Sequence, residues 1–195
     1  MKLALFDFDG TITTKDTLFE FCRFKAGKLK FLAGLVWLAP VLVLQRLQLI
    51  PAQRAKEIVL AYFVGGMVHA QFRNLCIAFA KERVPALLRP QAQEAMATHT
   101  TNHVRILIVS ASPEDWIKPW AHRVGAEVLA TRLQVVEGKI SGKIEGKNCN
   151  GVEKVARIKS EVNLAAATYI YAYGDSRGDL PMLALAQEKY FKPFR

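Results

Sequence analysis

Near its start the chain reads Leu3-Ala4-Leu5-Phe6-Asp7-Phe8-Asp9-Gly10-Thr11, and this run is the strongest indication of the fold. The four apolar residues are typical of a short buried strand. The two carboxylates fall where that strand ends, and Gly10 lets the backbone bend sharply and approach a ligand closely. Ligands of open α/β sheets bind outside the carboxyl ends of the strands. Because two like charges this close are unfavourable without a cation or a proton between them, the run predicts a site for a hard metal ion and a phosphate.

The hydrophobic pattern beyond this run divides the chain into two parts. From residue 15 to residue 100 the patterning is helical throughout. After it, apolar runs and helical segments alternate, as parallel strands joined by crossover helices do. We expect strands at 105–109, 127–130, 169–173 and 190–192, helices at 113–124, 151–162 and 180–186, and a hairpin that turns near Gly138.

This alternation predicts an α/β fold, a three-layer Rossmann-like core built on a parallel sheet. Residues 1–14 and 101–195 would form the core. Residues 15–100 would form an all-helical cap, inserted between the first and second strands and lying over the strand ends. The three tryptophans, Trp37, Trp116 and Trp120, fall in apolar helical contexts and are expected to be buried.

Composition narrows the class of protein. The chain has 195 residues, 51% hydrophobic and 23% charged, which fits a globular protein and argues against disorder. Its three cysteines show no metal-binding spacing, so reduced thiols in a cytoplasmic protein are expected, and no cleavable signal peptide is evident. The net charge of +10 favours anionic partners. The basic residues are spread along the chain without an RNA-binding aromatic signature, so nucleic acid is not an expected partner.

The segment Phe31 to Leu44 contains no charged residue. It is short for a bilayer span, which needs ~20 apolar residues, and Pro40 should break or kink a helix there. Basic residues flank it on both sides, among them Lys28 and Lys30. Two interpretations remain open: a helical hairpin buried in the cap, or an apolar surface that rests on an anionic bilayer.

Three further motifs accompany the first acidic pair. Ser110 ends an apolar run, where a hydroxyl and the following amides suit a phosphate oxygen. Gly174 ends another, and Asp175 and Asp179 after it would add carboxylate oxygens of the kind that Mg²⁺ prefers. A lysine ahead of that strand, either Lys154 or Lys147, would neutralise a phosphate or a nucleophilic carboxylate.

These motifs, in this order and spacing, resemble the haloacid dehalogenase-like hydrolase superfamily over essentially the whole chain. Residues 148–155 look like the phosphoserine phosphatase subgroup, and the apolar cap segment is similar to that of a bacterial phosphatidylglycerophosphatase. Two departures from phosphoserine phosphatases are Ser176-Arg177-Gly178, where a Gly-x-Asn form is common, and Ser110-Ala111-Ser112-Pro113, where a glycine pair is usual.

The resemblance implies a Mg²⁺-dependent phosphatase. Asp7 would attack phosphorus and form an aspartyl-phosphate, and Asp9 would act as general acid and base. Mg²⁺ would be held by Asp7, Asp9 through its carbonyl, Asp175 and Asp179. The phosphate-binding residues would be Ser110, Lys154, Gly10, Thr11 and Ala111.

The residues are compatible with several functions. The expected substrate is a small phosphoserine-like metabolite, handled in the cytoplasm. The alternative is a phospholipid headgroup monoester, with residues 31–44 in peripheral contact with the inner membrane surface. A non-catalytic phosphate-binding module and a phosphotransferase are further alternatives, because only the exclusion of water by the cap separates transfer from hydrolysis.

Overall fold

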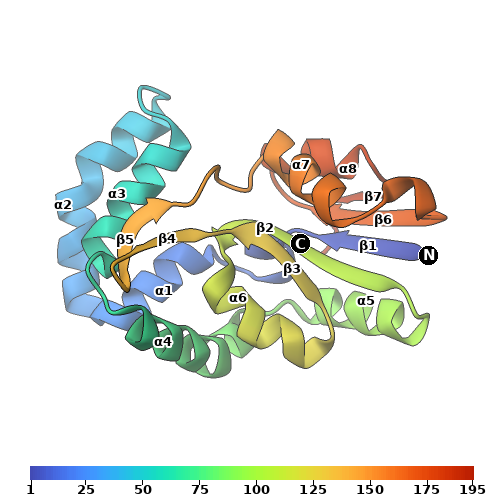
Figure 1. The fold of residues 1–195 in the computed structure, drawn as a ribbon, viewed down its shortest axis with the longest axis horizontal. Helices are drawn as coiled ribbons and strands as arrows, with labels where there is room; N and C mark the ends of the chain where they lie inside the picture. The colour runs from blue at the N-terminus through green and yellow to red at the C-terminus, as the bar shows by residue number, and fades with distance from the viewer.

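A five-stranded parallel sheet forms the centre of the computed structural model, which describes residues 1–195 (Figure 1). Its strands lie in the order β3-β2-β1-β6-β7, and every neighbouring pair is parallel. Their bounds are β1 (Lys2–Phe6), β2 (Arg105–Pro113), β3 (Glu127–Thr131), β6 (Tyr169–Gly174) and β7 (Glu188–Phe191). Because β1 is the middle strand, the carboxylates that follow it lie at the centre of the sheet edge.

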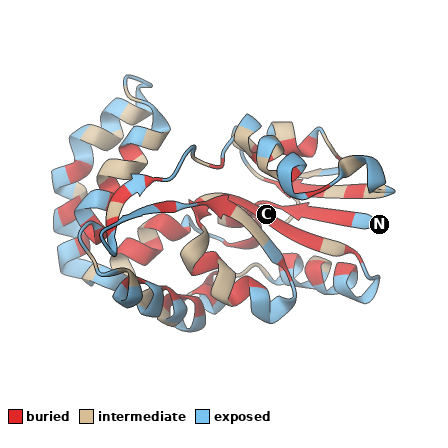
Figure 2. Cartoon of the chain, viewed as in Figure 1, coloured by how far each residue is buried: buried red, intermediate tan, exposed pale blue.

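Helices cover both faces of this sheet. Helices α5 (Pro90–Thr101) and α6 (Glu114–Ala121) pack on one face, and α7 (Val152–Glu161) and α8 (Leu180–Leu183) pack on the other. Successive side chains of a strand point to opposite faces: Ala4 and Phe6 of β1 belong to one buried cluster, Leu3 and Leu5 to the other. Figure 2 shows the strands buried between the helical layers. The predicted three-layer Rossmann-like α/β fold is confirmed.

The insertion between β1 and β2 is helical, as expected. It holds α1 (Thr17–Ala26), α2 (Lys28–Arg46), α3 (Ala52–Val64) and α4 (His69–Glu82), followed by α5. The hairpin of β4 (Leu133–Val136) and β5 (Lys139–Ile144) comes from the core part of the sequence but packs on α3. Its Ile140 N–H donates to the carbonyl of Met67 at 2.9 Å. Conversely, α5 packs on β2. The division at residues 14/15 and 100/101 stays a prediction.

The apolar segment of the insertion differs from expectation. Pro40 was expected to break or kink the helix; helix α2 runs through it from Lys28 to Arg46, so there is no break. Only Phe31, Gly34 and Leu38 of this helix are buried, which rules out the interpretation of residues 31–44 as a buried hairpin. Trp37, expected in the core, is 75% exposed, whereas Trp116 and Trp120 are buried as expected.

The elements near the end of the chain also differ in extent. The helix expected over 180–186 ends at Leu183. The strand expected over 190–192 is β7, which begins two residues and ends one residue earlier. Leu185 and Ala186 donate their N–H groups to the carbonyls of Met182 and Leu183, three residues back. That tighter winding ends the α-helix.

Candidate active site

The buried centre of the site is an ion triad at the ends of β1 and β6. Lys154, on the first turns of α7, places its Nζ 2.6 Å from Asp7 Oδ1 and 2.6 Å from Asp179 Oδ1. The same Nζ donates to the carbonyl of Val109, on β2, at 2.7 Å. All three members of the triad are buried. Lys147, the competing candidate, is exposed to solvent, so the structure brings Lys154 to the acidic residues.

Charge and burial oppose one another in this triad. Burial raises the pKa of Asp7 to about 7, although Lys154 acts in the opposite direction. For Lys154, burial alone would lower the pKa, but the two carboxylates outweigh it and the pKa is raised. For Asp179, burial alone would raise the pKa, but Lys154 and the hydrogen bonds from Ser176 together lower it. The lysine is therefore held as a cation between two carboxyl groups.

Three carboxylates gather where a cation could be held. Asp7, Asp175 and Asp179 each offer an oxygen, and these oxygens lie within 4.8 Å of one another. Gly10 is in the left-handed region with φ +82°, and a Cβ there would lie 2.4 Å from Asp175 Oδ2, so only glycine allows the turn to approach this carboxylate. A set of carboxylate oxygens suits a hard cation such as Mg²⁺. The residues present fit that ion.

The remaining predicted phosphate-binding residues lie close by. Ser110 is buried in the carboxyl-terminal half of β2, and its Oγ accepts the N–H of Ser112 at 3.0 Å, which leaves its own proton to donate. The Thr11 hydroxyl donates to Asp7 Oδ2 at 3.2 Å. The Gly10 N–H reaches the Thr13 hydroxyl at 3.4 Å.

Ala111 joins the core to the cap through its carbonyl. Thr131 of β3 donates to this oxygen at 2.5 Å. Lys56 of α3 donates to it at 3.0 Å and also to Asn148 Oδ1 at 3.1 Å. Burial lowers the pKa of Lys56. Sequence reasoning missed Lys56, because no local pattern marks one helical lysine as the one that reaches the sheet edge.

Asp9 is held by residues that sequence reasoning also missed. Its Oδ1 accepts the N–H of Thr17 at 2.7 Å and the Thr17 hydroxyl at 2.6 Å. Its Oδ2 accepts the hydroxyl of Ser112 at 2.5 Å. The indole N–H of Trp116 donates to Thr17 Oγ1 at 3.2 Å. The one available signal was Ser112 itself, which belongs to the stretch where phosphoserine phosphatases usually carry a glycine pair.

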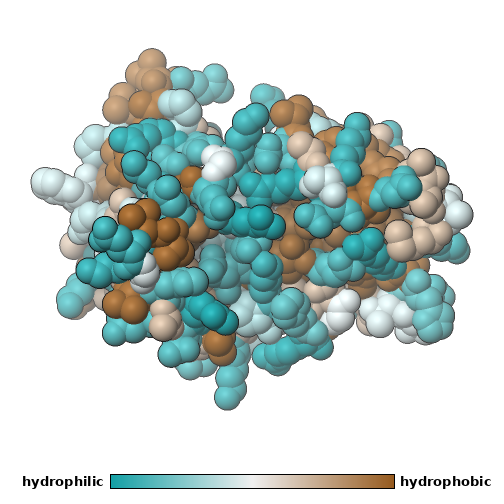
Figure 3. All heavy atoms as spheres, in the orientation of Figure 1, coloured by the Kyte–Doolittle hydropathy of each residue, from teal (hydrophilic) through white to brown (hydrophobic).

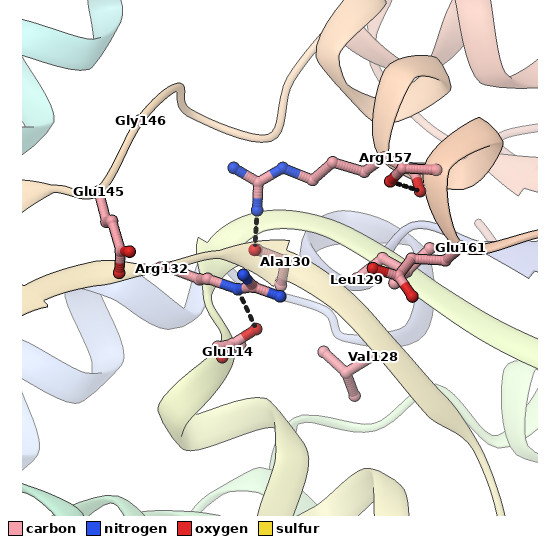
Figure 4. A pocket seen from close by; sticks show the side chains of 10 residues that line it. Glu114, Val128, Leu129, Ala130, Arg132, Glu145, Gly146, Arg157 and Glu161 are labelled. Carbon is pink, nitrogen blue, oxygen red and sulfur yellow. Dashed lines mark hydrogen bonds and ion pairs between the residues drawn. The ribbon is translucent and has the colours of Figure 1, made fainter.

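A separate pocket of about 300 Å³ lies beside this site, between α7, β3 and the segment that leads from the hairpin (Figure 4). Arg157 crosses it and donates to the carbonyls of Ala130 and Lys147. Arg132 pairs with Glu114 across its floor at 3.6 Å. None of the acidic residues of the triad lines this pocket. The bonds from Arg157 link β3 to the segment that follows the β4–β5 hairpin, which indicates a structural role for this pocket.

Comparison with known proteins agrees with this architecture. The family model of the haloacid dehalogenase-like hydrolases matches residues 4–184. The chain is 36% identical over 199 residues to Protein CicA of Caulobacter vibrioides, covering 99% of this chain and 86% of that protein. It is 34% identical over 120 residues to a probable phosphatase of Mycobacterium tuberculosis, covering 58% of this chain and 40% of that protein.

Solved structures share the fold. A protein of unknown function from Bordetella pertussis superposes with a TM-score of 0.83 at 23% identity, over 95% of this chain and 86% of that one. A phosphoserine phosphatase bearing a phospho-aspartyl intermediate analogue gives 0.69 at 19% identity, over 96% and 84%.

The chain therefore belongs to the haloacid dehalogenase-like hydrolases. Within this family its fold is that of the phosphoserine phosphatases.

Proposed function

We propose that the chain hydrolyses a phosphomonoester in two steps, through an aspartyl-phosphate on Asp7. The observation that carries the proposal is the placement of Asp7 at the end of the central strand, beside Lys154 and with Asp9 two residues on. Asp7 attacks phosphorus while the bond to the leaving oxygen breaks, and Asp9 protonates that oxygen. Asp9 then takes a proton from water as the water oxygen displaces Asp7. Lys154, Ser110, Gly10, Thr11 and Ala111 bind the phosphoryl oxygens.

The same proposal includes Mg²⁺. Asp7, Asp175 and the backbone carbonyl of Asp9 would hold it, and when bound it neutralises charge on the phosphoryl group. Asp179 would act through water, because its Oδ1 already accepts Lys154 and its Oδ2 accepts both the N–H and the hydroxyl of Ser176. The bonds from Ser176 orient Asp179, and the Lys154 ammonium balances its charge.

For the substrate we propose a small, phosphoserine-like metabolite in the cytoplasm. Lys56 supports an anionic leaving group: it reaches the carboxyl end of β2 from α3, where it donates to a backbone carbonyl and an amide oxygen and not to a carboxylate. Its position predicts a preference for phosphomonoesters that carry a second negative charge. A charge-removing Lys56→Met change should raise the KM for such substrates more than for a neutral one.

One observation favours a second candidate, a phosphatase of lipid headgroups. Helix α2 is long and apolar enough to cross a membrane, yet little of it is buried in the protein. Its exposed apolar side chains continue to the tip that joins α2 to α3, where Figure 3 shows an apolar cluster. They are Leu29, Leu32, Val36, Trp37, Val43, Leu44, Leu47 and Leu49. With Lys28 and Lys30 beside them, this face suits peripheral contact with an anionic bilayer.

The decisive test measures phosphate release from phosphoserine, nucleotides, sugar phosphates and a phospholipid headgroup monoester in detergent, with Mg²⁺ and with EDTA. We expect release that requires Mg²⁺ and is abolished by Asp7→Asn, with the circular dichroism spectrum unchanged. Undiminished release by the Asp7→Asn variant would exclude Asp7 as the nucleophile.

Sedimentation with anionic liposomes at low salt separates the two substrate classes. A lipid phosphatase should sediment with them, and the double reversal Lys28→Glu and Lys30→Glu should abolish this. The matched control reverses two exposed basic residues of the core, Arg123 and Lys159. If the native protein stays in the supernatant, the lipid candidate fails.

A further inference from the structure

The hydrogen bonds around Asp9 assign different tasks to its two carboxylate oxygens. Oδ1 accepts two donors from Thr17, a backbone N–H at 2.7 Å and a hydroxyl at 2.6 Å. Oδ2 accepts one donor, the hydroxyl of Ser112 at 2.5 Å. Thr17 is the first residue of α1 in the cap, and Ser112 lies in β2 of the core. The carboxylate is thus held from the cap side at one oxygen and from the core side at the other.

The protons of this network can be counted. The backbone N–H of Thr17 can only donate. The Thr17 hydroxyl accepts the indole N–H of Trp116 at 3.2 Å, and its single proton has two acceptors, Asp9 Oδ1 at 2.6 Å and Ser112 Oγ at 3.3 Å. The shorter contact takes the proton. Oδ1 therefore faces two donors, and a proton carried by the carboxyl group must reside on Oδ2.

We propose that Ser112 is a positioning residue of the general acid: it holds Asp9 so that Oδ2 delivers the proton. This inference rests on the proposed function. A protonated carboxyl oxygen can still accept, so Ser112 can donate to Oδ2 while Oδ2 donates to the leaving oxygen. The proton then passes from Oδ2 to that oxygen as its bond to phosphorus breaks and the bond from Asp7 to phosphorus forms.

The Ser112 side chain can be changed without disturbing the backbone of β2. Ser112 is 2% exposed, and its backbone N–H, which alanine retains, makes the bond to Ser110. Its φ does not lie in the left-handed region, so alanine adopts the same backbone. Without the hydroxyl, Asp9 remains held at Oδ1 alone and can turn about that anchor. A misplaced general acid loses rate without losing substrate binding.

The experiment measures kcat/KM for phenyl phosphate and p-nitrophenyl phosphate, because this ratio reports the step in which the leaving group departs. The two esters have similar shapes, but nitrophenolate leaves readily without a proton. General acids contribute about 10²–10⁴-fold in rate. We expect Ser112→Ala to lower kcat/KM for phenyl phosphate about 10-fold more than for p-nitrophenyl phosphate. Ser112→Thr, which retains a hydroxyl, should restore most of the loss, and Ser141→Ala on the exposed hairpin should change neither.

Asp9→Asn separates failure of the inference from failure of the proposed function. The proposed general acid predicts that Asp9→Asn lowers kcat/KM for phenyl phosphate more than for p-nitrophenyl phosphate. If Ser112→Ala then lowers kcat/KM for both esters equally, or for neither, Ser112 does not position the acid. If Asp9→Asn shows no selectivity, or the native protein releases no phosphate from either ester, the proposed general acid itself is wrong and the inference falls with it.

Discussion

Lys154 is the residue on which the acidic site depends most. It is 1% exposed and satisfies one oxygen of each of two buried carboxylates. Breaking a buried ion pair from one side leaves an uncompensated charge, which costs far more than the pair contributes. The site thus has a structural requirement for this cation that is separate from any role in binding phosphate.

Replacing this lysine should therefore destabilise the protein. We expect Lys154→Met to lower the free energy of unfolding by about 3–5 kcal/mol, because Asp7 and Asp179 lose their shared partner. Urea unfolding in EDTA measures this. Lys159→Met, exposed on the same helix, is the control and should change stability by less than about 0.5 kcal/mol. Equal effects of the two changes would contradict the account.

Gly10 gives a second prediction at this scale. A Gly10→Ala change places a Cβ 2.4 Å from Asp175 Oδ2, on a backbone with φ +82°. Gly125 has φ +69° with nothing within 4 Å of its Cβ position, so Gly125→Ala carries the same backbone cost, about 1–2 kcal/mol, without the clash. Mg²⁺ should raise the melting temperature of the native protein and the Gly125 variant but not of the Gly10 variant. A full Mg²⁺ response in the Gly10 variant would contradict a metal site here.

At the scale of elements, α5 is joined to the sheet by a buried histidine. His99 Nε2 lies 2.9 Å from the Tyr173 hydroxyl of β6, and its ring meets Phe6 edge-on. Burial lowers the pKa of His99 below the usual 6.5, although Glu188 acts in the opposite direction. The folded state therefore disfavours the imidazolium form.

This histidine makes a definite prediction for stability against pH. The unfolded chain binds a proton on His99 below pH 6.5, whereas the folded chain binds it only at a lower pH, so stability is full above pH 6.5 and is lost as the pH falls. His99→Gln cannot be protonated. The melting temperature of the native protein minus that of the variant should shrink between pH 7.5 and pH 5. A constant difference would show that His99 does not titrate in this way.

Elements also differ in how well local sequence predicts them. The strands could be predicted from short apolar runs, because a strand that is buried on both faces has apolar residues at nearly every position. The exposure of α2 could not be predicted from the sequence, because an apolar helix has the same composition whether or not a neighbouring element covers it. Pro40 likewise failed to break the helix, since its local cost was outweighed by the rest of the helix.

At the scale of the whole molecule, the acidic cluster was predictable because topology forces it. Parallel strands β1 and β6 are neighbours, so Asp7 and Asp175 must meet at one sheet edge. The partners supplied by the cap were not predictable, because Thr17 and Lys56 reach the site through tertiary packing that no spacing encodes. The helical insertion and the sheet are joined at this edge, so we expect the insertion to move when substrate enters and water follows.

The most direct test of this account is the mass of acid-quenched protein after rapid mixing with Mg²⁺ and a phosphomonoester that it hydrolyses. We predict a hydroxylamine-sensitive phosphoryl adduct on the peptide that contains Asp7, formed before phosphate is released and absent from the Asp7→Asn variant. Phosphate release with no adduct at any time, and at the same rate in the variant, would contradict covalent catalysis by Asp7.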